Sequence, residues 1–228
     1  MAVYKNKELI IFGTGLIAEE IYNYFRLDSH YNVKAFVKDK KFIKKKKFLG
    51  LPVCPLDGIE KKFSPKKYDA FVAIGYTNLN ELREEKFKTL KKKGYRLANY
   101  ISSKSCIVNK QNNYENCLVL ENSTIQTTAY IGKNVFVWAN NLIGHHVKVM
   151  DNSYISGNCT VAGSSIIGKN CFLGVGSTVS HGIKVGEKSL IGANSLVTKN
   201  LRKGSIVVEQ SSKIIESKNL EISKKVIK

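Results

Sequence analysis

One stretch of sequence, residues 143–197, decides the fold: IGHHVKVMDNSYISGNCTVAGSSIIGKNCFLGVGSTVSHGIKVGEKSLIGANSLV. From Val119 to Val197, a range that begins four hexads before this stretch, every sixth residue is aliphatic. The fourteen positions are Val119, Ile125, Ile131, Val137, Ile143, Val149, Ile155, Val161, Ile167, Leu173, Val179, Val185, Ile191 and Val197. If about a third of residues were aliphatic, chance would give this run on the order of once in a million sequences. A six-residue repeat with one inward aliphatic side chain per short strand is typical of a parallel β-helix.

A longer period of 18 residues is superimposed on the six-residue period. Related tetrads recur at this spacing at residues 131–134 (IGKN), 149–152 (VMDN), 167–170 (IGKN) and 185–188 (VGEK). Three hexads therefore make one coil, and glycine or asparagine stands where the chain turns because both tolerate positive φ. Cys159 and Cys171 fall on inward positions, which predicts core residues rather than nucleophiles.

Composition excludes several classes of protein. The 228 residues are 43% hydrophobic and 24% charged, which are ordinary globular values. No apolar run approaches the roughly 18 residues of a membrane span, and the N-terminus has no signal-peptide cleavage site, so we expect a cytoplasmic protein. Five cysteines without a CxxC pair argue against a disulfide scaffold and against a thiolate zinc site.

The charge balance predicts anionic partners. The 37 Lys and Arg residues exceed the 18 Asp and Glu residues by 19. Such an excess attracts nucleic acid, anionic lipid or small phosphorylated substrates. The excess is spread over both halves of the chain, and the only dense cluster is the segment 40–47 (KKFIKKKK). We interpret this segment as a solvated loop or as a rim that attracts phosphate, and we expect no nucleic-acid partner.

The first hundred residues differ in kind from the repeats. Strand-like runs at residues 8–12, 33–37, 68–75 and 96–101 alternate with helical periodicity at residues 17–25 and 80–93. This alternation predicts a small parallel α/β domain. We therefore divide the chain into an α/β domain at residues 1–102, a β-helix at 103–204 and a C-terminal extension at 205–228.

A glycine loop follows the first predicted strand. Residues 13–18 (GTGLIA) fit the G-x-G-x-x-[G/A] pattern, in which glycines let the backbone approach a pyrophosphate at a helix N-terminus. A dinucleotide site requires an acidic residue at the end of the second strand, whereas Lys38 stands there, followed by Asp39. The sequence thus disfavours NAD and leaves a nucleotide diphosphate as a candidate ligand. The alternative is that the glycines only pack a tight turn.

Three residues at the 18-residue spacing form one column on the surface of the predicted β-helix, and two of them, His145 and Gly163, are catalytic candidates. His145 occupies an outward position of its hexad, Gly163 lies one coil further on, and His181 lies one coil beyond that. A histidine above a glycine leaves a notch beside a base, and the glycine offers a bare N–H. Acyl transfer needs both a base near neutral pKa and a donor to the developing oxyanion.

The chain resembles the NeuD/PglD-type sugar acetyltransferases, a family of hexapeptide-repeat acyltransferases. The resemblance extends from Leu9 to about Val197 and is sharpest at residues 143–148 (IGHHVK), 162–163 (AG) and 168–174 (GKNCFLG). It implies an N-terminal Rossmann-like domain, a left-handed parallel β-helix and a homotrimer with active sites between adjacent β-helices. It also implies acetyl transfer from acetyl-CoA, as a co-substrate, to a nucleotide-linked amino sugar, as in the biosynthesis of surface polysaccharides.

The resemblance assigns roles to individual residues. The catalytic histidine matches His145, and the glycine whose amide contacts the acetyl carbonyl matches Gly163. We include His146 in the catalytic set as a residue that orients His145 or lines a subunit interface. The predicted acetyl-CoA contacts are Tyr154, Gly163, Val175 and Ala193. The predicted nucleotide-sugar contacts are Thr14, Gly15, Leu16, Lys38, Asp39 and Gly75.

The sequence departs from the family pattern at several of these positions. His146 stands where the family has an acidic residue, Tyr154 replaces a CoA-contacting histidine, and Lys38 replaces an aspartate. The glycine loop is one residue shorter than in the family, and the C-terminal G-x-P-A-K signature is missing. These departures bear on which sugar nucleotide is used and on the choice between N- and O-acetylation.

Three alternatives remain beside N-acetylation. The first is O-acetylation on the same scaffold. The second is a metal site like that of γ-carbonic anhydrases, for which the spacing of His145 and His181 suits two ligands, but Gly186 stands where a third histidine is expected. The third is a non-enzymatic trimer that binds polyanions through its lysines. We predict an acetyltransferase with no permanently bound cofactor and no metal.

Overall fold

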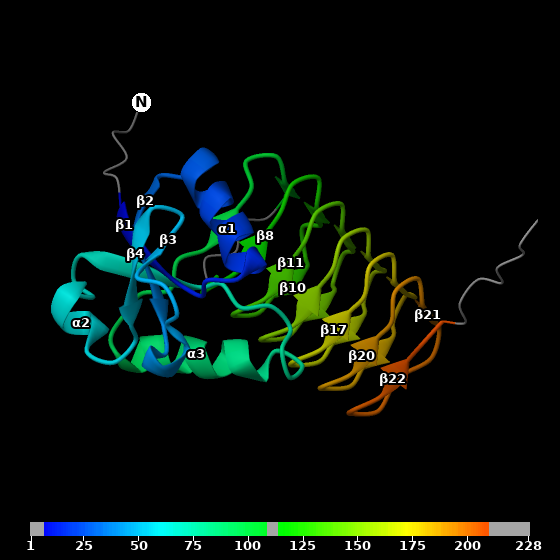
Figure 1. The fold of residues 1–228 in the computed structure, drawn as a ribbon. Helices are drawn as coiled ribbons and strands as arrows, with labels where there is room; N and C mark the ends of the chain where they lie inside the picture. The colour runs from blue at the N-terminus through cyan, green and yellow to red at the C-terminus, as the bar shows by residue number, and fades with distance from the viewer. Residues whose placement is uncertain (1–6, 109–113, 210–228) are drawn as a thin grey trace, which may run out of the picture.

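The computed structural model describes residues 7–108 and 114–209, which form an α/β domain followed by a parallel β-helix (Figure 1). The strands of the first domain are β1 (Lys7–Phe12), β2 (Tyr31–Lys38), β3 (Lys47–Phe48), β4 (Leu51–Pro55) and β5 (Tyr68–Val72). The helices are α1 (Leu16–Leu27), the short 3-10 helix η1 (Lys40–Phe42), α2 (Ile59–Lys62) and α3 (Glu81–Lys92). The sheet order is β3-β4-β2-β1-β5, and only the β3–β4 pair is antiparallel. The predicted α/β class is confirmed.

Alternation along β1 explains why both faces of this sheet are covered. Leu9 and Ile11 pack with α1 residues such as Phe25 on one face, whereas Ile10 and Phe12 pack with α2 and α3 on the other. A parallel strand that is buried on both sides reads as a continuous apolar run, and residues 9–12 (LIIF) are such a run. The α1 face also contacts the β-helix, so the two domains share one hydrophobic cluster.

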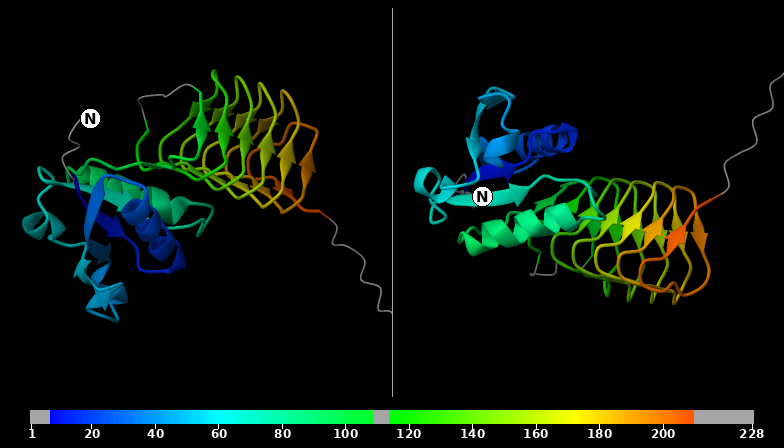
Figure 2. Two further views of the ribbon diagram at one scale, coloured as in Figure 1. Left: turned by 90° about the horizontal axis from the view of Figure 1, so that it is seen from above. Right: turned by 60° about the horizontal axis from the view of Figure 1, so that its bottom comes forward.

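The β-helix is a three-sided prism whose coils stack along the chain (Figure 2). Face 1 consists of β6 (Tyr100–Ile101), β8 (Leu118–Val119), β11 (Phe136–Val137), β14 (Tyr154–Ile155), β17 (Phe172–Leu173), β20 (Leu190–Ile191) and β22 (Ile206–Val207). Face 2 consists of β7 (Cys106–Ile107), β9 (Thr124–Ile125), β12 (Leu142–Ile143), β15 (Thr160–Val161), β18 (Thr178–Val179) and β21 (Leu196–Val197). Face 3 consists of β10 (Tyr130–Ile131), β13 (Lys148–Val149), β16 (Ile166–Ile167) and β19 (Lys184–Val185). Partner residues in successive coils are 18 apart, as Phe136 and Tyr154 are, so the predicted period is confirmed.

The interior of the prism contains the aliphatic residues of the six-residue period. All fourteen predicted positions are buried and belong to one cluster. Cys159 and Cys171 lie in the same cluster, and burial raises the pKa of the Cys171 thiol to about 11. A buried thiol with a raised pKa is a poor nucleophile, so the prediction that these cysteines are core residues is confirmed.

One edge of the prism carries a ladder of buried asparagines. The asparagine corner, where face 3 turns into face 1, consists of Asn116, Asn134, Asn152 and Asn170. Each has positive φ, and neighbouring side chains are linked by Nδ2–H···Oδ1 bonds of 2.8, 2.9 and 3.4 Å. Asparagine adopts the left-handed conformation readily, and a stacked amide satisfies both its donor and its acceptor. The asparagines that repeat in the sequence thus link successive coils through side-chain hydrogen bonds.

The asparagine corner also holds the N-terminal domain in place. Asn116 Oδ1 accepts a 2.7 Å hydrogen bond from the N–H of Val72, the last residue of β5. Arg83 of α3 is fully buried, donates to the carbonyls of Gly75 (2.8 Å) and Asn152 (2.8 Å), and stacks on Phe136. Its hydrogen-bond partners are neutral, and burial lowers the pKa of its guanidinium to about 9. These contacts fix the α/β domain against face 1.

Two features at the domain ends differ from the predicted elements. Residues 96–101 do not close the α/β sheet as a strand: Leu97 makes a single bridge to Ala70, and Tyr100–Ile101 instead begins face 1 as β6. At the other end, β22 continues face 1 beyond residue 204. The predicted domain boundaries stay a prediction, and residues 210–228 of the predicted extension lie outside the described residues. None of the described helices has the length and apolar character needed to cross a membrane.

Candidate active site

The predicted catalytic column lies on the edge of the prism where face 2 turns into face 3. We call His145, His146, Gly163 and His181 the histidine corner. His145 follows β12, and the two later positions follow β15 and β18 of the same face. In a three-sided prism this edge is opposite face 1, which the N-terminal domain covers. The histidine corner is therefore on the far side of the β-helix from that domain.

The ring of His145 sits over Gly163, as the 18-residue spacing predicts. A Cβ atom added to Gly163 would lie 2.6 Å from His145 Nε2 and 2.5 Å from Cε1, so the ring occupies the space that any larger residue would need. The His181 ring follows, with its centroid 6.0 Å from that of His145. The Gly163 carbonyl accepts a bond from Gly182, whereas its N–H donates to none of the described residues. A ring nitrogen and a backbone donor thus lie side by side.

Side chains of the preceding coil hold the two histidines by their backbones. The N–H of His145 donates to Gln126 Oε1 at 2.6 Å, and that of His146 donates to Thr128 Oγ1 at 2.9 Å. The carbonyl of His145 accepts a bond from Ser164 in the next coil. The two rings meet at their Nδ1 atoms, 3.0 Å apart. Gln126 and Thr128 were not among the predicted site residues, although each lies one coil before the histidines.

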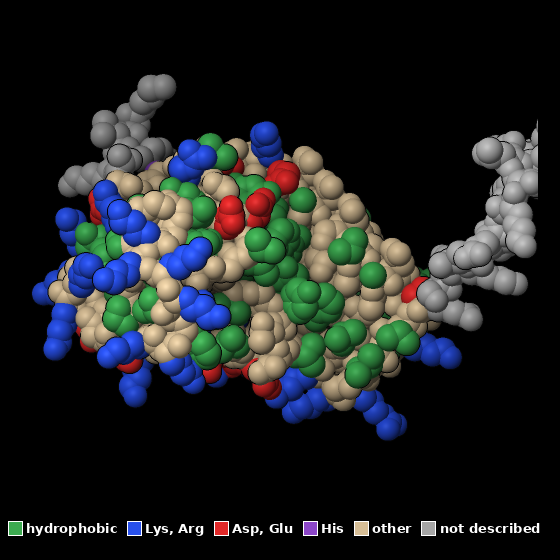
Figure 3. Space-filling view, in the orientation of Figure 1, with side chains coloured by type: hydrophobic (Ala, Val, Ile, Leu, Met, Phe, Trp, Pro, Cys, Tyr) green, Lys and Arg blue, Asp and Glu red, His purple; other side chains and the backbone are tan. Residues whose placement is uncertain are grey.

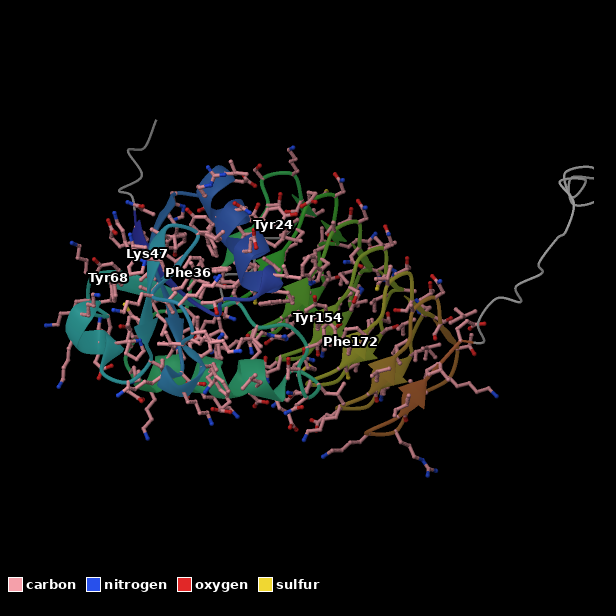
Figure 4. The ribbon with its side chains drawn as sticks, viewed as in Figure 1. Tyr24, Phe36, Lys47, Tyr68, Tyr154 and Phe172 are labelled. Carbon is pink, nitrogen blue, oxygen red and sulfur yellow. The ribbon has the colours of Figure 1, made fainter. Side chains whose placement is uncertain are left out.

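The predicted acetyl-CoA residues lie at a different edge. Val175 and Ala193 stand one coil apart where face 1 turns into face 2, and both are exposed. Tyr154 is instead buried on face 1, where its ring packs against Tyr76 and Phe172 (Figure 4). This packing gives Tyr154 a role in the joint between the domains, and its contact with acetyl-CoA stays a prediction.

All six predicted nucleotide-sugar residues line one cleft of about 510 Å³ in the N-terminal domain. They are Thr14, Gly15, Leu16, Lys38, Asp39 and Gly75. The cleft lies at the carboxyl ends of β1, β2 and β5, where parallel α/β sheets bind their ligands. The fold thus brings residues from three separate segments of the sequence into one cleft.

The two glycines of the loop have different roles: Gly13 permits close packing, and Gly15 leaves the N-terminus of α1 open to a ligand. Gly13 has a φ of 128°, and a Cβ there would lie 2.7 Å from the Ala73 carbonyl, so this glycine is needed for close packing. Gly15 is the N-cap of α1, and a Cβ there would meet nothing within 4 Å. The first amides of α1 have no partner within the helix, which makes this end suited to an anion.

Two lysines place positive charge in the cleft. Lys38 Nζ donates to Thr14 Oγ1 at 2.9 Å. Lys86 of α3 pairs with Asp39 at 2.9 Å, and although burial opposes its charge, hydrogen bonds to Glu85 and Asp39 raise its pKa. Lys86 was not among the predicted site residues, and its only signal in the sequence is its place three residues after Arg83 on the inward side of α3. Figure 3 shows further Lys and Arg side chains around this domain.

The structure does not bring the cleft and the histidine corner of one chain together. The cleft is in the domain that covers face 1, whereas His145 is at the edge opposite that face. The exposed Val175 and Ala193 lie at the edge between faces 1 and 2. In the described parts of the chain, no three His, Cys, Asp or Glu side chains are close enough to hold a metal ion.

Comparison with known families accounts for both halves of the chain. The model described as the PglD N-terminal domain matches residues 8–90. Two hexapeptide models match the β-helix: the bacterial transferase hexapeptide (six repeats) at residues 128–163 and the hexapeptide repeat of succinyl-transferase at residues 165–199. The chain thus joins a domain that matches the PglD N-terminal model to a β-helix that matches hexapeptide-repeat models. The predicted resemblance and the predicted fold class are confirmed.

Solved structures share this PglD-type architecture over most of the chain. A point mutant of perosamine N-acetyltransferase from Caulobacter crescentus, in complex with CoA and GDP-perosamine, is 21% identical, with 89% of this chain and 93% of that chain covered and a TM-score of 0.78. The acetyltransferase domain of PglB from Neisseria gonorrhoeae is 19% identical, with 88% and 96% covered and a TM-score of 0.76. WeeI from Acinetobacter baumannii is 18% identical, with 89% and 97% covered and a TM-score of 0.73. No curated protein matches the chain by sequence. At these identities the likeness shows the fold.

Proposed function

We propose that the protein transfers an acetyl group from acetyl-CoA to a nucleotide-linked amino sugar. The observation that carries this proposal is the imidazole of His145 over Gly163, which puts a base beside a free backbone donor. The hexapeptide transferase models and the PglD model support the reaction class. The Caulobacter N-acetyltransferase of the same fold binds CoA together with GDP-perosamine.

The reaction needs one base and one oxyanion donor. The amine of the acceptor attacks the thioester carbonyl, and the Gly163 N–H donates a hydrogen bond to the oxygen of the tetrahedral intermediate. His145 Nε2 takes the proton that the amine loses and returns it to the CoA sulfur as the carbon–sulfur bond breaks. Acetyl-CoA lies along the exposed Val175 and Ala193, with the acetyl group at Gly163.

The N-terminal cleft holds the nucleotide in this proposal. Its pyrophosphate binds the N-terminal amides of α1 beside Thr14 and Gly15. Lys38 and Lys86 supply positive charge to the cleft, and Asp39 is kept in place by Lys86. The net charge of +19 draws in two substrates that are both polyanions.

A second copy of the chain completes the site. The cleft and the histidine corner of one chain lie on opposite sides of the β-helix, so the acceptor bound by one chain reaches His145 of another. We propose a homotrimer in which each interface pairs one cleft with the histidine corner of a neighbour. The oligomeric state is measured by light scattering on the purified protein, and a monomer with full activity would contradict this arrangement.

The first experiment measures thiol release from acetyl-CoA with UDP-, dTDP- and GDP-linked amino sugars and their hydroxy counterparts. We expect turnover with an amino sugar that is lost in His145→Ala. Turnover with only a hydroxy sugar would instead indicate O-acetylation. An absence of CoA binding by the folded protein would contradict the acyltransferase proposal.

A complementation experiment tests the shared site. Gly15→Trp fills the nucleotide cleft and His145→Ala removes the base, so each variant alone should be inactive. Co-expressed chains should regain activity, because some interfaces then pair an intact cleft with an intact histidine. Continued inactivity of mixed trimers would show that both groups must come from one chain.

A further inference from the structure

His145 and His146 contact each other through the same kind of ring atom. Their Nδ1 atoms are 3.0 Å apart and the rings are nearly perpendicular, at 83°. At that distance two nitrogens share one hydrogen, because two N–H groups repel each other and two lone pairs form no bond. One ring therefore donates to the other, and the direction of this bond decides which nitrogen of His145 is free.

We propose that His146 is a positioning residue that accepts the Nδ1–H of His145 and so leaves His145 Nε2 free to act as the base. This inference rests on the proposed acetyl transfer. If the bond ran the other way, His145 would carry its hydrogen on Nε2 and could not accept a proton from the acceptor. A neutral imidazole thus orients the base here.

His146 stands at a turn position of the β-helix. Its φ is 58°, in the left-handed region, as at Asn140 and Asn152, the preceding and following turn positions at the other two edges. That conformation is less favourable for histidine than for asparagine or glycine. The backbone N–H of His146 donates to Thr128 Oγ1 and holds the residue at this turn, while its Nδ1 lies against Nδ1 of His145.

The side chains that hold the pair, Gln126 and Thr128, are uncharged, and His181 is the titratable group packed against His145. A carboxylate at position 146 would instead stabilise the imidazolium form of His145.

Three substitutions at one position separate these effects. His146→Asn keeps an acceptor, because Oδ1 takes the place of Nδ1 and asparagine suits the positive φ; we expect kcat within about threefold of wild type. His146→Ala removes the acceptor, and we expect kcat to fall about tenfold with KM unchanged. His146→Asp places a carboxylate beside His145, and we expect the acidic limb of the kcat/KM profile to move to higher pH. Thermal unfolding checks that each variant is folded.

Imidazole ¹⁵N NMR reads the tautomer of the full-length protein without a substrate. The expected result is hydrogen on Nδ1 of His145 in the wild type and in His146→Asn, and a shift toward Nε2 in His146→Ala. Hydrogen on Nε2 of His145 in the wild type would overturn the inference, as would a folded His146→Ala with wild-type kcat and pH profile. If no acceptor is turned over but Nδ1 carries the hydrogen, the pairing stands and only the proposed reaction fails.

Discussion

Two edges of the same prism share the left-handed backbone conformation but differ in what their side chains do. At the asparagine corner, identical residues at a spacing of 18 stack their amides into a buried ladder. At the histidine corner, the left-handed positions are His146, Ser164 and Gly182, and the exposed side chains follow no repeat. At both edges the chain turns from one face to the next, and the flanking strands follow the same six-residue period.

The difference separates structural from chemical positions within a repeat protein. A repeated polar residue satisfies its neighbours in adjacent coils, and burial makes each of those bonds necessary. Where the repeat is broken at an exposed edge, the side chains are available to a ligand. Positions that depart from the repeat are therefore the ones to examine for function.

The largest expected effect is at the histidine corner. His145→Ala removes the proposed base, so we expect kcat for acetyl transfer to fall about 10³-fold. Since the side chain is exposed and outside the core, the melting temperature should stay within a few degrees of wild type. Steady-state kinetics and calorimetry measure the two quantities, and near-wild-type kcat would refute the assigned role.

Gly163→Ala should be the next largest change. Its methyl group would overlap the His145 ring, so the ring must move away from the donor, and we expect kcat to fall about 10²-fold. In a His145→Ala background the same substitution meets no ring and should leave thermal stability unchanged. A stability loss of equal size in both backgrounds would show that the overlap is not with the ring.

At the asparagine corner the expected effect is on stability rather than on rate. Asn134→Gly keeps the positive φ but removes two buried amide bonds, and we expect about 2 kcal/mol less free energy of unfolding. Asn140→Gly is the matched control, since Asn140 has a φ of 61° but is exposed. Denaturant unfolding compares the two, and equal losses would mean that the ladder adds nothing.

The smallest expected effect is in the nucleotide cleft. Lys38→Met removes the charge beside Thr14, and we expect about fivefold weaker binding of a nucleoside diphosphate by calorimetry. Lys47→Met, at the exposed start of β3, should change the affinity less than twofold. Equal losses at both positions would attribute binding to net charge rather than to this cleft.

Much of the candidate site could be predicted from the sequence, but the side chains that hold the histidines in place and the second lysine of the cleft could not. The spacing of His145, Gly163 and His181 predicted the column because each coil has a fixed length. It could not find Gln126 and Thr128, whose bonds to the histidine backbones depend on side-chain direction, or Lys86, which reaches the cleft from α3. It also placed residues 96–101 in the α/β sheet, although pairing with the β-helix took over from Tyr100 onward.

The sequence by itself determined the β-helix, its coil length and the column of residues at each edge, because a strict period leaves one way to bury the aliphatic positions. It also determined the glycine loop and the sheet beside it. Only the tertiary structure decided that the N-terminal domain covers face 1, that Tyr154 is buried in the joint and that the cleft and His145 lie on opposite sides. Those outcomes depend on contacts between distant segments, such as Asn116 with Val72 and Arg83 with the carbonyl of Asn152, which no local pattern encodes.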